Sequence, residues 1–426
     1  MDLTGVLDTL GEPGTIVLGG LVIGMLFGAF AQRSRFCLRA AVVEFARGSL
    51  GPKVSLWLIA FSMAVLGTQA LILSGLLDVS ESRQLAAAGS LSGAIIGGLM
   101  FGVGMILTRG CSGRLLVLSA NGNLRALLSG LIFAVTAQAS LHGALSPARD
   151  ALAGLWVVEA PSVLNALTLI GLESRGGVVL ALALTGFAVF VAVRNRLSPW
   201  VWIGGLGVGG TIAAGWLLTY SLSYQAFDPV QVESLSFTGP SADTLMLVLN
   251  PPGSALDFDV GLVPGVFLGS FLAALLCRDL KLEGFQGGYA MRRYIVGAVF
   301  MGFGGMLAGG CAVGAGVTGG AVFALTAWTA LFCMWVGAAL ADLVVDRWGL
   351  VLRDEAAAGE NALANAMARR GWSFLPPWWR PRGPGPDRHA PDDGAASAPA
   401  TAPSDGGRAV SAGSCRPARS RDVLAS

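Results

Sequence analysis

Long apolar blocks, separated by short polar or charged stretches, dominate the pattern of this chain. Each block is roughly as long as a helix needs to cross a hydrocarbon core of about 30 Å, and the blocks carry almost no charge inside. The pattern predicts an all-α membrane protein with about nine transmembrane helices, at about 15–31, 54–77, 90–108, 124–145, 177–194, 199–219, 258–277, 292–309 and 322–345.

Shorter apolar segments lie between these blocks, several of them next to glycine. They cover about 36–47, 111–120, 161–171, 241–250 and 312–320. Each is too short to cross a bilayer, so we interpret them as half-helices or re-entrant loops. Irregular backbone is tolerated at membrane depth only when it is buried in protein or lines a cavity.

The distribution of charge predicts how the chain is oriented. Arginine and lysine follow the first, fifth, seventh and ninth blocks, whereas the long connection 220–257 has four acidic residues and no basic one. The positive-inside rule therefore puts the C-terminus in the cytoplasm and the N-terminus outside. The start of the chain, 1–13, lacks a basic region, so no cleaved signal peptide is expected.

Composition separates a membrane domain from a tail. The chain is 54% hydrophobic and 13% charged, about half the charged fraction of soluble domains. From about residue 369 the sequence is rich in Pro, Gly, Ala, Ser, Arg and Asp and cannot bury a core. We predict a membrane domain at 1–350 and a cytoplasmic tail at 351–426, disordered from about 369. Nothing in either part indicates a nucleic-acid partner.

Two internal similarities suggest a duplicated unit. The segment Gly20–Phe30 resembles Gly261–Phe271, and Gly102–Cys111 resembles Gly302–Cys311, in the same order along the chain. With nine spans, the second pair is inverted across the membrane but the first pair is parallel. The sequence therefore predicts an internal repeat without fixing its symmetry.

The most distinctive chemical feature is a glycine–cysteine sequence followed by small residues, which occurs twice. It occurs as Gly110-Cys111-Ser112-Gly113 and as Gly310-Cys311-Ala-Val-Gly314. Glycine can end a helix there, and the short helix that follows offers free N–H groups and a positive dipole end to an anion. A single buried cysteine is usually a packing residue, but the matched contexts favour two loops that form a constriction lined by thiols.

Other cysteines and arginines allow two interpretations. Cys37 lies in Arg33–Leu38, where Arg33 and Arg35 can attract an anion or simply set the topology. Arg109 and Arg114 flank Cys111, and each can act on a ligand or reach toward the membrane surface. The contexts of Cys277 and Cys333 favour packing. Cys415 lies in the tail, and no role is expected for it.

The chain lacks the spacing of common cofactor sites. It has no CxxC pair and only two histidines, His142 and His389, the second in the tail. Zinc, a dithiol redox motif and haem ligation by paired histidines are therefore not expected, and no catalytic residue or other cofactor is predicted.

Three groups of residues together resemble the YeeE/YedE family of membrane proteins, which includes thiosulfate permeases. The groups are Arg35–Leu38, then Gly98–Met105 running into Gly110–Gly113 with Gly122-Asn123 downstream, and Gly302–Gly304 running into Gly310-Cys311 and Gly314. The resemblance covers roughly residues 15–345. Arg114 stands where a smaller residue is more usual, and the stretch after Cys311 lacks the polar residue often found beside Gly314.

The resemblance implies an hourglass-shaped helical protein in the inner (plasma) membrane of a bacterium. Its three motif cysteines correspond to Cys37, Cys111 and Cys311, between which thiosulfate is thought to pass through S–H···S hydrogen bonds. It also implies a small cytoplasmic sulfur-carrier protein as partner, and some relatives are associated with selenium or other sulfur compounds. The expected substrate path contains Cys37, Gly110, Cys111, Ser112, Gly113, Asn123, Gly310, Cys311, Gly314 and Arg109.

We therefore hypothesise a permease for a small sulfur-containing anion, with neutral thiols as weak, successive donors. A membrane thiol–disulfide oxidoreductase is one alternative, and it needs a spatially close cysteine pair. A non-transporting assembly factor for sulfur transfer is another. Uptake by liposomes containing the protein discriminates among the three.

Overall fold

The structure is a computed structural model that describes residues 4–79, 82–86, 89–158, 165–169, 171, 174–227, 230–249, 257–284 and 288–348. The chain divides into two compact units, 1–347 and 348–426. The tail that we predict at 351–426 lies outside the described residues. The first unit holds all of the membrane-spanning helices that the structure describes.

Within the described residues, nine helices are long and apolar enough to cross a membrane, in agreement with the predicted number and positions. They are α1 (Thr4–Ser34), α3 (Pro52–Leu73), α5 (Leu91–Leu107), α7 (Leu124–Leu141), α11 (Ser174–Arg194), α12 (Pro199–Ser223), α14 (Phe258–Leu276), α15 (Gly288–Leu307) and α17 (Leu325–Ala341).

Short helices occupy the short apolar segments. They are α2 (Leu38–Ala46), α6 (Ser112–Ala120), α13 (Thr238–Leu249) and the π-helix η1 (Ala312–Thr318), which continues into α16 (Gly319–Ala321). Of the predicted segment 161–171, the structure describes Asn165, α10 (Ala166–Leu169) and Gly171. The remaining elements are α4 (Arg83–Ala86), α8 (Ser146–Ala153), η2 (Asp342–Trp348), and β1 (Gly89–Ser90) paired antiparallel with β2 (Val157–Val158).

Glycine contacts show how the long helices run. On α1, Gly20 and Gly24 lie against Phe258 and Leu262 of α14, so these two helices are parallel. On α5, Gly97 lies against Gly304 of α15 and Gly104 against Gly297, so this pair is antiparallel. Contacts along the other helix pairs fit the same scheme, in which successive long helices alternate in direction.

The described helices form two halves with inverted orientation. The order α1, α2, α3, α5, α6, α7 is repeated as α12, α13, α14, α15, η1, α17. In the sequence, α11 comes between the two sets. Equivalent helices run in opposite directions, because Gly19 on α1 meets Leu218 on α12 while Ser34 meets Gly204. The similarity of 102–111 to 302–311 therefore reflects the inverted repeat. The similarity of α1 to α14 does not, because these helices occupy non-equivalent places.

Small residues explain why α1 and α14 share a glycine pattern. Gly20, Gly24 and Gly28 on one helix alternate with glycines on the other, and a Cβ at each position would collide with backbone of the partner helix. The Ser270 hydroxyl donates to the Gly28 carbonyl at 3.2 Å across this seam. Without water to drive association in a bilayer, such close van der Waals contact is a main source of helix pairing.

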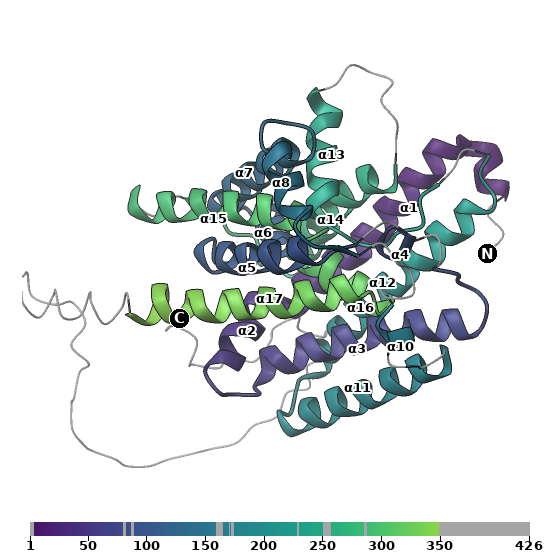
Figure 1. Ribbon diagram of the computed structural model, residues 1–426, viewed down its shortest axis with the longest axis horizontal. Coiled ribbons are helices and arrows are strands. Elements are labelled where there is room, and N and C mark those ends of the chain that lie inside the picture. The colour runs from purple at the N-terminus through teal and green to yellow at the C-terminus, as the bar shows by residue number, and fades with distance from the viewer. Residues whose placement is uncertain are drawn as a thin grey trace, which may run out of the picture. The chain divides into compact units, whose positions relative to one another are not determined.

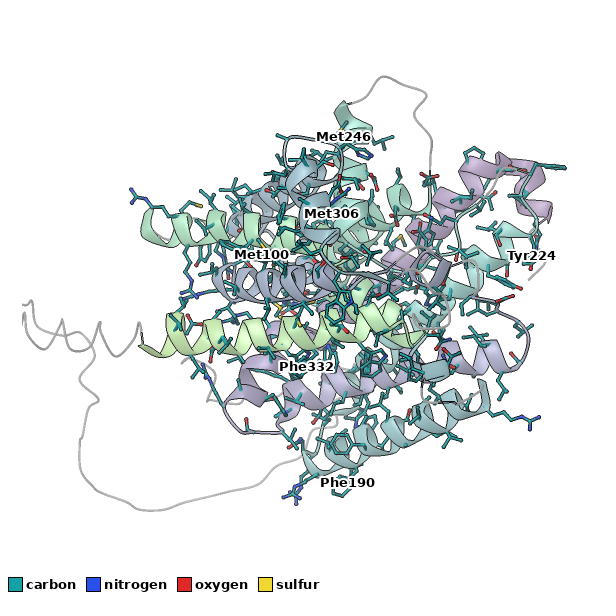
Figure 2. The ribbon with its side chains drawn as sticks, in the orientation of Figure 1. Met100, Phe190, Tyr224, Met246, Met306 and Phe332 are labelled. Carbon is teal, nitrogen blue, oxygen red and sulfur yellow. The ribbon has the colours of Figure 1, made fainter. Side chains whose placement is uncertain are left out.

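Apolar side chains on the outer faces point away from the bundle. Phe190 on α11 and Phe332 on α17 are 62% and 69% exposed, and Figure 2 shows Phe190 at the edge of the molecule. Figure 1 shows α11 at the edge of the bundle beside α3, with α5, α15 and α17 side by side nearer the centre. Exposed apolar surface on this scale is stable only against lipid, which fits a multi-pass membrane protein.

Candidate functional site

Each of the three cysteines that the sequence singles out begins a short helix. Cys37 is the N-cap residue of α2, Cys111 that of α6 and Cys311 that of η1, all in extended backbone conformation. The first N–H groups of a helix have no partner within the helix and form its positive end. The fold thus places a thiol at the positive end of each of these three half-helices, where first-turn N–H groups such as that of Gly314 reach the sulfur.

Two of the three thiols meet. The side chains of Cys37 and Cys111 are close enough to share a hydrogen bond, and the backbone N–H of Leu38 also reaches the Cys111 sulfur. Cys111 is 2% exposed and Cys37 is half-buried, and both are free thiols. The starts of α2 and α6 therefore face each other across these two sulfurs, which we call the thiol pair.

Unused hydrogen-bond donors surround the thiol pair. Arg114, in the first turn of α6, is close enough to Cys37 and Cys111 to interact with both electrostatically, and its Nη1 is buried without a hydrogen-bond partner. The hydroxyl of Ser112 is also buried and unpartnered. Arg35, which precedes Cys37, is the other charged group near Arg114. This surrounding is cationic and rich in donors, a setting that favours an anion.

The third thiol lies beside a cavity in the second half. Cys311 is fully buried, and its Sγ accepts a hydrogen bond from the Gly314 N–H at 3.3 Å. Gly310 and Gly314, on either side of it, line a cavity of about 240 Å³. Its wall includes Ser236, Thr238, Glu233, Asp259 and Met306, the last of which lies in the middle of the bundle in Figure 2.

A short stretch before α13 contacts both half-helix starts. Ser236 packs against Gly314 in the first turn of η1, and the next residue, Phe237, packs against Gly113 in the first turn of α6. Phe237 is fully buried, with its ring 5.2 Å from that of Phe27 on α1. The first turns of η1 and α6 thus pack against two consecutive residues, Ser236 and Phe237.

Several other predicted path residues have structural roles. Gly310 has φ 154°, and a Cβ there would lie 2.7 Å from the Ala315 nitrogen, so only glycine fits. Asn123 caps α7 by accepting from the Ala126 N–H at 2.9 Å and donates to the Glu283 carboxylate. This hydrogen bonding fixes the start of α7 and leaves the Asn123 amide little capacity for a ligand.

The remaining candidates lie apart from the thiol pair. Arg109 is exposed in the turn before Cys111 with φ 59°, and Gly110 next to it is buried. Cys277 accepts a hydrogen bond from Arg33 Nη1 at 3.3 Å. Cys333 packs on Gly98 between α17 and α5. Cys333 is buried between helices, whereas Cys277 is half-buried and bonded to an arginine.

Ion pairs fix the half-helix α2 at one end of the bundle. Asp346 of η2 accepts from Arg39 of α2 at 3.2 Å and from Arg293 of α15 at 2.7 Å. Arg47 lies 3.9 Å from Asp342. We call this end the cationic end. The ion pairs join α2 to elements of the other half and so position the first turn that carries Cys37.

The sequence pattern did not predict a role for the segment Ser236–Thr238. The pattern predicts a short apolar segment at about 241–250, but α13 begins at Thr238, directly after Phe237. A signal was present in Thr238-Gly-Pro240, because threonine followed shortly by proline is typical of a helix start. This fourth half-helix start has no cysteine and so lacks the pattern that marks the other three.

Nine alternating spans, inverted halves and half-helices that meet inside the bundle define a polytopic membrane transporter within the part of the chain that the structure describes. Comparison with known families gives the class a name. A family model described as "Sulphur transport" matches residues 33–340, so the chain belongs to the sulphur-transport (YeeE/YedE) family, as the resemblance implied. This is a family of transporters and not of enzymes.

Two relatives are named thiosulfate transporter TsuA. That of Escherichia coli strain K12 is 26% identical over 352 residues, which cover 78% of this chain and 95% of the relative. That of Spirochaeta thermophila is 25% identical over 326 residues, which cover 73% and 93%. Both similarities extend over nearly the whole length of the relatives.

Proposed function

We propose that this protein is a thiosulfate permease whose substrate moves past Cys311 and then the thiol pair. The observation that carries the proposal is the position of the three cysteines, each at the start of a half-helix and two of them in contact. The relatives named thiosulfate transporter support the choice of substrate.

The chemistry of thiosulfate suits this arrangement. The anion has a soft terminal sulfur at one end and charged oxygens at the other. A neutral thiol donates only weakly to sulfur, so each contact is easily broken, and several weak sites favour passage over retention. Helix starts supply the N–H donors that a partly dehydrated anion requires.

The contacts support one order of stations in this proposal. The cavity beside Cys311 is the first station, the ring of Phe237 the barrier, and the thiol pair the second station. By the positive-inside rule the cationic end faces the cytoplasm, with the N-terminus outside and the C-terminus inside. In this proposal the membrane is the bacterial inner membrane, and a small sulfur-carrier protein receives the product at the cationic end.

Uptake of radiolabelled thiosulfate by liposomes containing the purified protein tests the proposal. We expect Cys111→Ala and Cys311→Ala each to reduce the uptake rate by at least about tenfold. Each variant loses one hydrogen bond to the charged substrate at the rate-limiting step. Cys333→Ala is the matched control, because it is also buried and its Cβ contact with Gly98 is kept. Unchanged uptake in both variants would contradict the thiol path, and liposomes that take up nothing would favour the assembly-factor alternative.

The contact between Cys37 and Cys111 also supplies the close pair that a thiol–disulfide enzyme needs. Membership in a transporter family opposes that alternative. A measurement separates the two: if thiosulfate uptake proceeds with both thiols remaining reduced throughout, as alkylation and mass spectrometry would show, the pair acts in transport without redox turnover.

A further inference from the structure

We infer that Arg114, together with Ser112, forms an oxyanion site at the thiol pair and determines which sulfur compounds this permease accepts. The inference rests on the proposed function and deepens it. The ligand is defined by its chemistry: a small anion that carries a soft terminal sulfur and a group of charged oxygens, as thiosulfate does.

The first observation is a cation without a counter-ion. Within the part of the chain that the structure describes, the ion pairs involve other arginines, and the charged or ionisable groups near Arg114 are two thiols and a second cation, Arg35. Its Nη1 is buried and unpartnered. A guanidinium at membrane depth costs several kcal/mol unless it is paired and hydrogen-bonded, so the site is complete only with an anion.

The second observation is independent of charge. Ser112 is 6% exposed and its Oγ has no hydrogen-bond partner. It precedes Arg114 by two residues in the same first turn of α6, at the positive end of that helix. An unpartnered hydroxyl, an unpartnered guanidinium nitrogen and a positive helix end in one place fit a ligand with several acceptor oxygens.

A comparison within the molecule shows that the arrangement is not general. Arg39 and Arg293, also half-buried near the cationic end, share the carboxylate of Asp346. These arginines hold helices together, whereas the groups that interact electrostatically with Arg114 are two thiols and Arg35. The planar fork of a guanidinium binds oxyanions in two contacts, and the thiols beside it suit a sulfur atom. Sulfate has the charged oxygens but no soft sulfur, and a simple thiol has the sulfur but no charged oxygens.

Substitution of Arg114 tests the inference with two readouts. In Arg114→Met, the KM for thiosulfate uptake should rise at least about tenfold, the lower value expected for one lost charged hydrogen bond. Arg114→Lys should retain part of the affinity, since the charge remains but the fork is lost. The control Arg125→Met removes another half-buried arginine, which lies over the Tyr294 ring, and its KM should stay within about twofold.

Thermal unfolding in detergent provides the second readout. Thiosulfate should raise the melting temperature of the wild-type protein and not that of Arg114→Met. Without ligand, Arg114→Met should melt at a higher temperature than wild type, because an unpaired buried cation has been removed. A purely structural arginine would give the opposite sign. If Arg114→Met does not fold, Ser112→Ala, a smaller change, should show the same loss of thiosulfate protection.

The outcomes separate the inference from the function on which it depends. If wild-type protein takes up no thiosulfate, the proposed function fails. If wild type takes it up and Arg114→Met does so with unchanged KM and unchanged thermal protection, the oxyanion site is overturned while the permease stands. Competition by sulfate that disappears in Arg114→Met would show that the guanidinium recognises the oxygens.

Discussion

The two halves of this protein use the same backbone device with different side chains. In the first half, α2 and α6 begin with cysteines that touch each other, beside an unpaired arginine. In the second half, α13 and η1 begin with Thr238 and Cys311, and a cavity with the acidic residues Glu233 and Asp259 lies beside them. The inverted repeat therefore supplies four helix starts. An arginine beside the first pair favours an anion there, whereas carboxyl groups lie in the cavity wall beside the second pair.

The difference suggests a direction for the path. In the proposed path, weak binding at the cavity beside Cys311 lets an anion arrive and leave. The thiol pair, with the positive charge of Arg114 beside it, holds the anion longer before release. Transport requires that neither station bind too tightly. Changes that make the two stations more alike, or that join them, should therefore have graded effects on uptake.

Linking the thiol pair should abolish transport, the largest of these effects. Diamide removes two electrons and two protons from Cys37 and Cys111, so that the sulfurs form a disulfide and the reagent is reduced to the hydrazine. We expect thiosulfate uptake to stop and to return after dithiothreitol, because neither sulfur can then donate a hydrogen bond. Mass spectrometry of the linked peptides checks the bond. Residual uptake by Cys37→Ala should not respond to diamide, and an equal response there would contradict the assignment.

The two equivalent turns should differ in their tolerance of alanine. Gly310→Ala forces φ near 154° on a residue with a Cβ that would also lie 2.7 Å from the Ala315 nitrogen. We expect a loss of about 1–3 kcal/mol in stability from strain alone, seen as a lower melting temperature and reduced uptake. Gly110→Ala meets only the Leu115 side chain at 3.4 Å and should change stability by less than about 0.5 kcal/mol. If the two variants lose equal stability, the backbone conformation at Gly310 does not distinguish the two turns.

Removing the ring between the two stations should join them. Phe237→Ala deletes a fully buried side chain that contacts Gly113 and Phe27, and its packing loss should cost about 3–5 kcal/mol. We also expect passive leakage of sulfate into liposomes, because the barrier between cavity and thiol pair is gone. Phe133→Ala, at a buried ring on α7, should lose stability without leakage. Leakage in both would assign it to general loosening.

The smallest effect is expected at the fourth helix start. Thr238 is fully buried with an unpartnered Oγ1 beside the cavity. Thr238→Val removes the donor and should raise the KM for thiosulfate by about two- to fivefold, near the value of one neutral hydrogen bond. Thr238→Cys should keep near-normal uptake and make the second half resemble the first. Thr68→Val, which removes an equally buried unpartnered hydroxyl on α3, should leave KM unchanged.

The sequence predicts the spans and the turns well, because hydropathy and glycine placement are local properties. It identifies Cys37, Cys111 and Cys311, since each stands beside glycine or arginine in a recognisable motif. It does not reveal that the first two touch, because α2 and α6 are joined by long-range packing. It also gives no sign that Phe237 separates the stations, since a phenylalanine in an apolar segment has no distinguishing pattern.

The repeat illustrates a different limit. The glycine spacing shared by α1 and α14 resembles a trace of duplication, yet these helices simply pack on each other and both need small residues. The true counterpart of α1 is α12, whose pattern differs because its neighbours differ. Similar spacing in membrane helices can thus report a shared interface and not a shared origin.

The helix α11 has a consequence for how such a molecule can arise. It packs beside α3, carries outward side chains such as Phe190 and contributes no group to the two stations as the structure describes them. Each half contains an even number of crossings, so two copies joined directly would enter the bilayer facing the same way. One additional crossing reverses the second copy. A single polypeptide thereby gains the two-sided passage that would otherwise require two separately inserted subunits of opposite orientation.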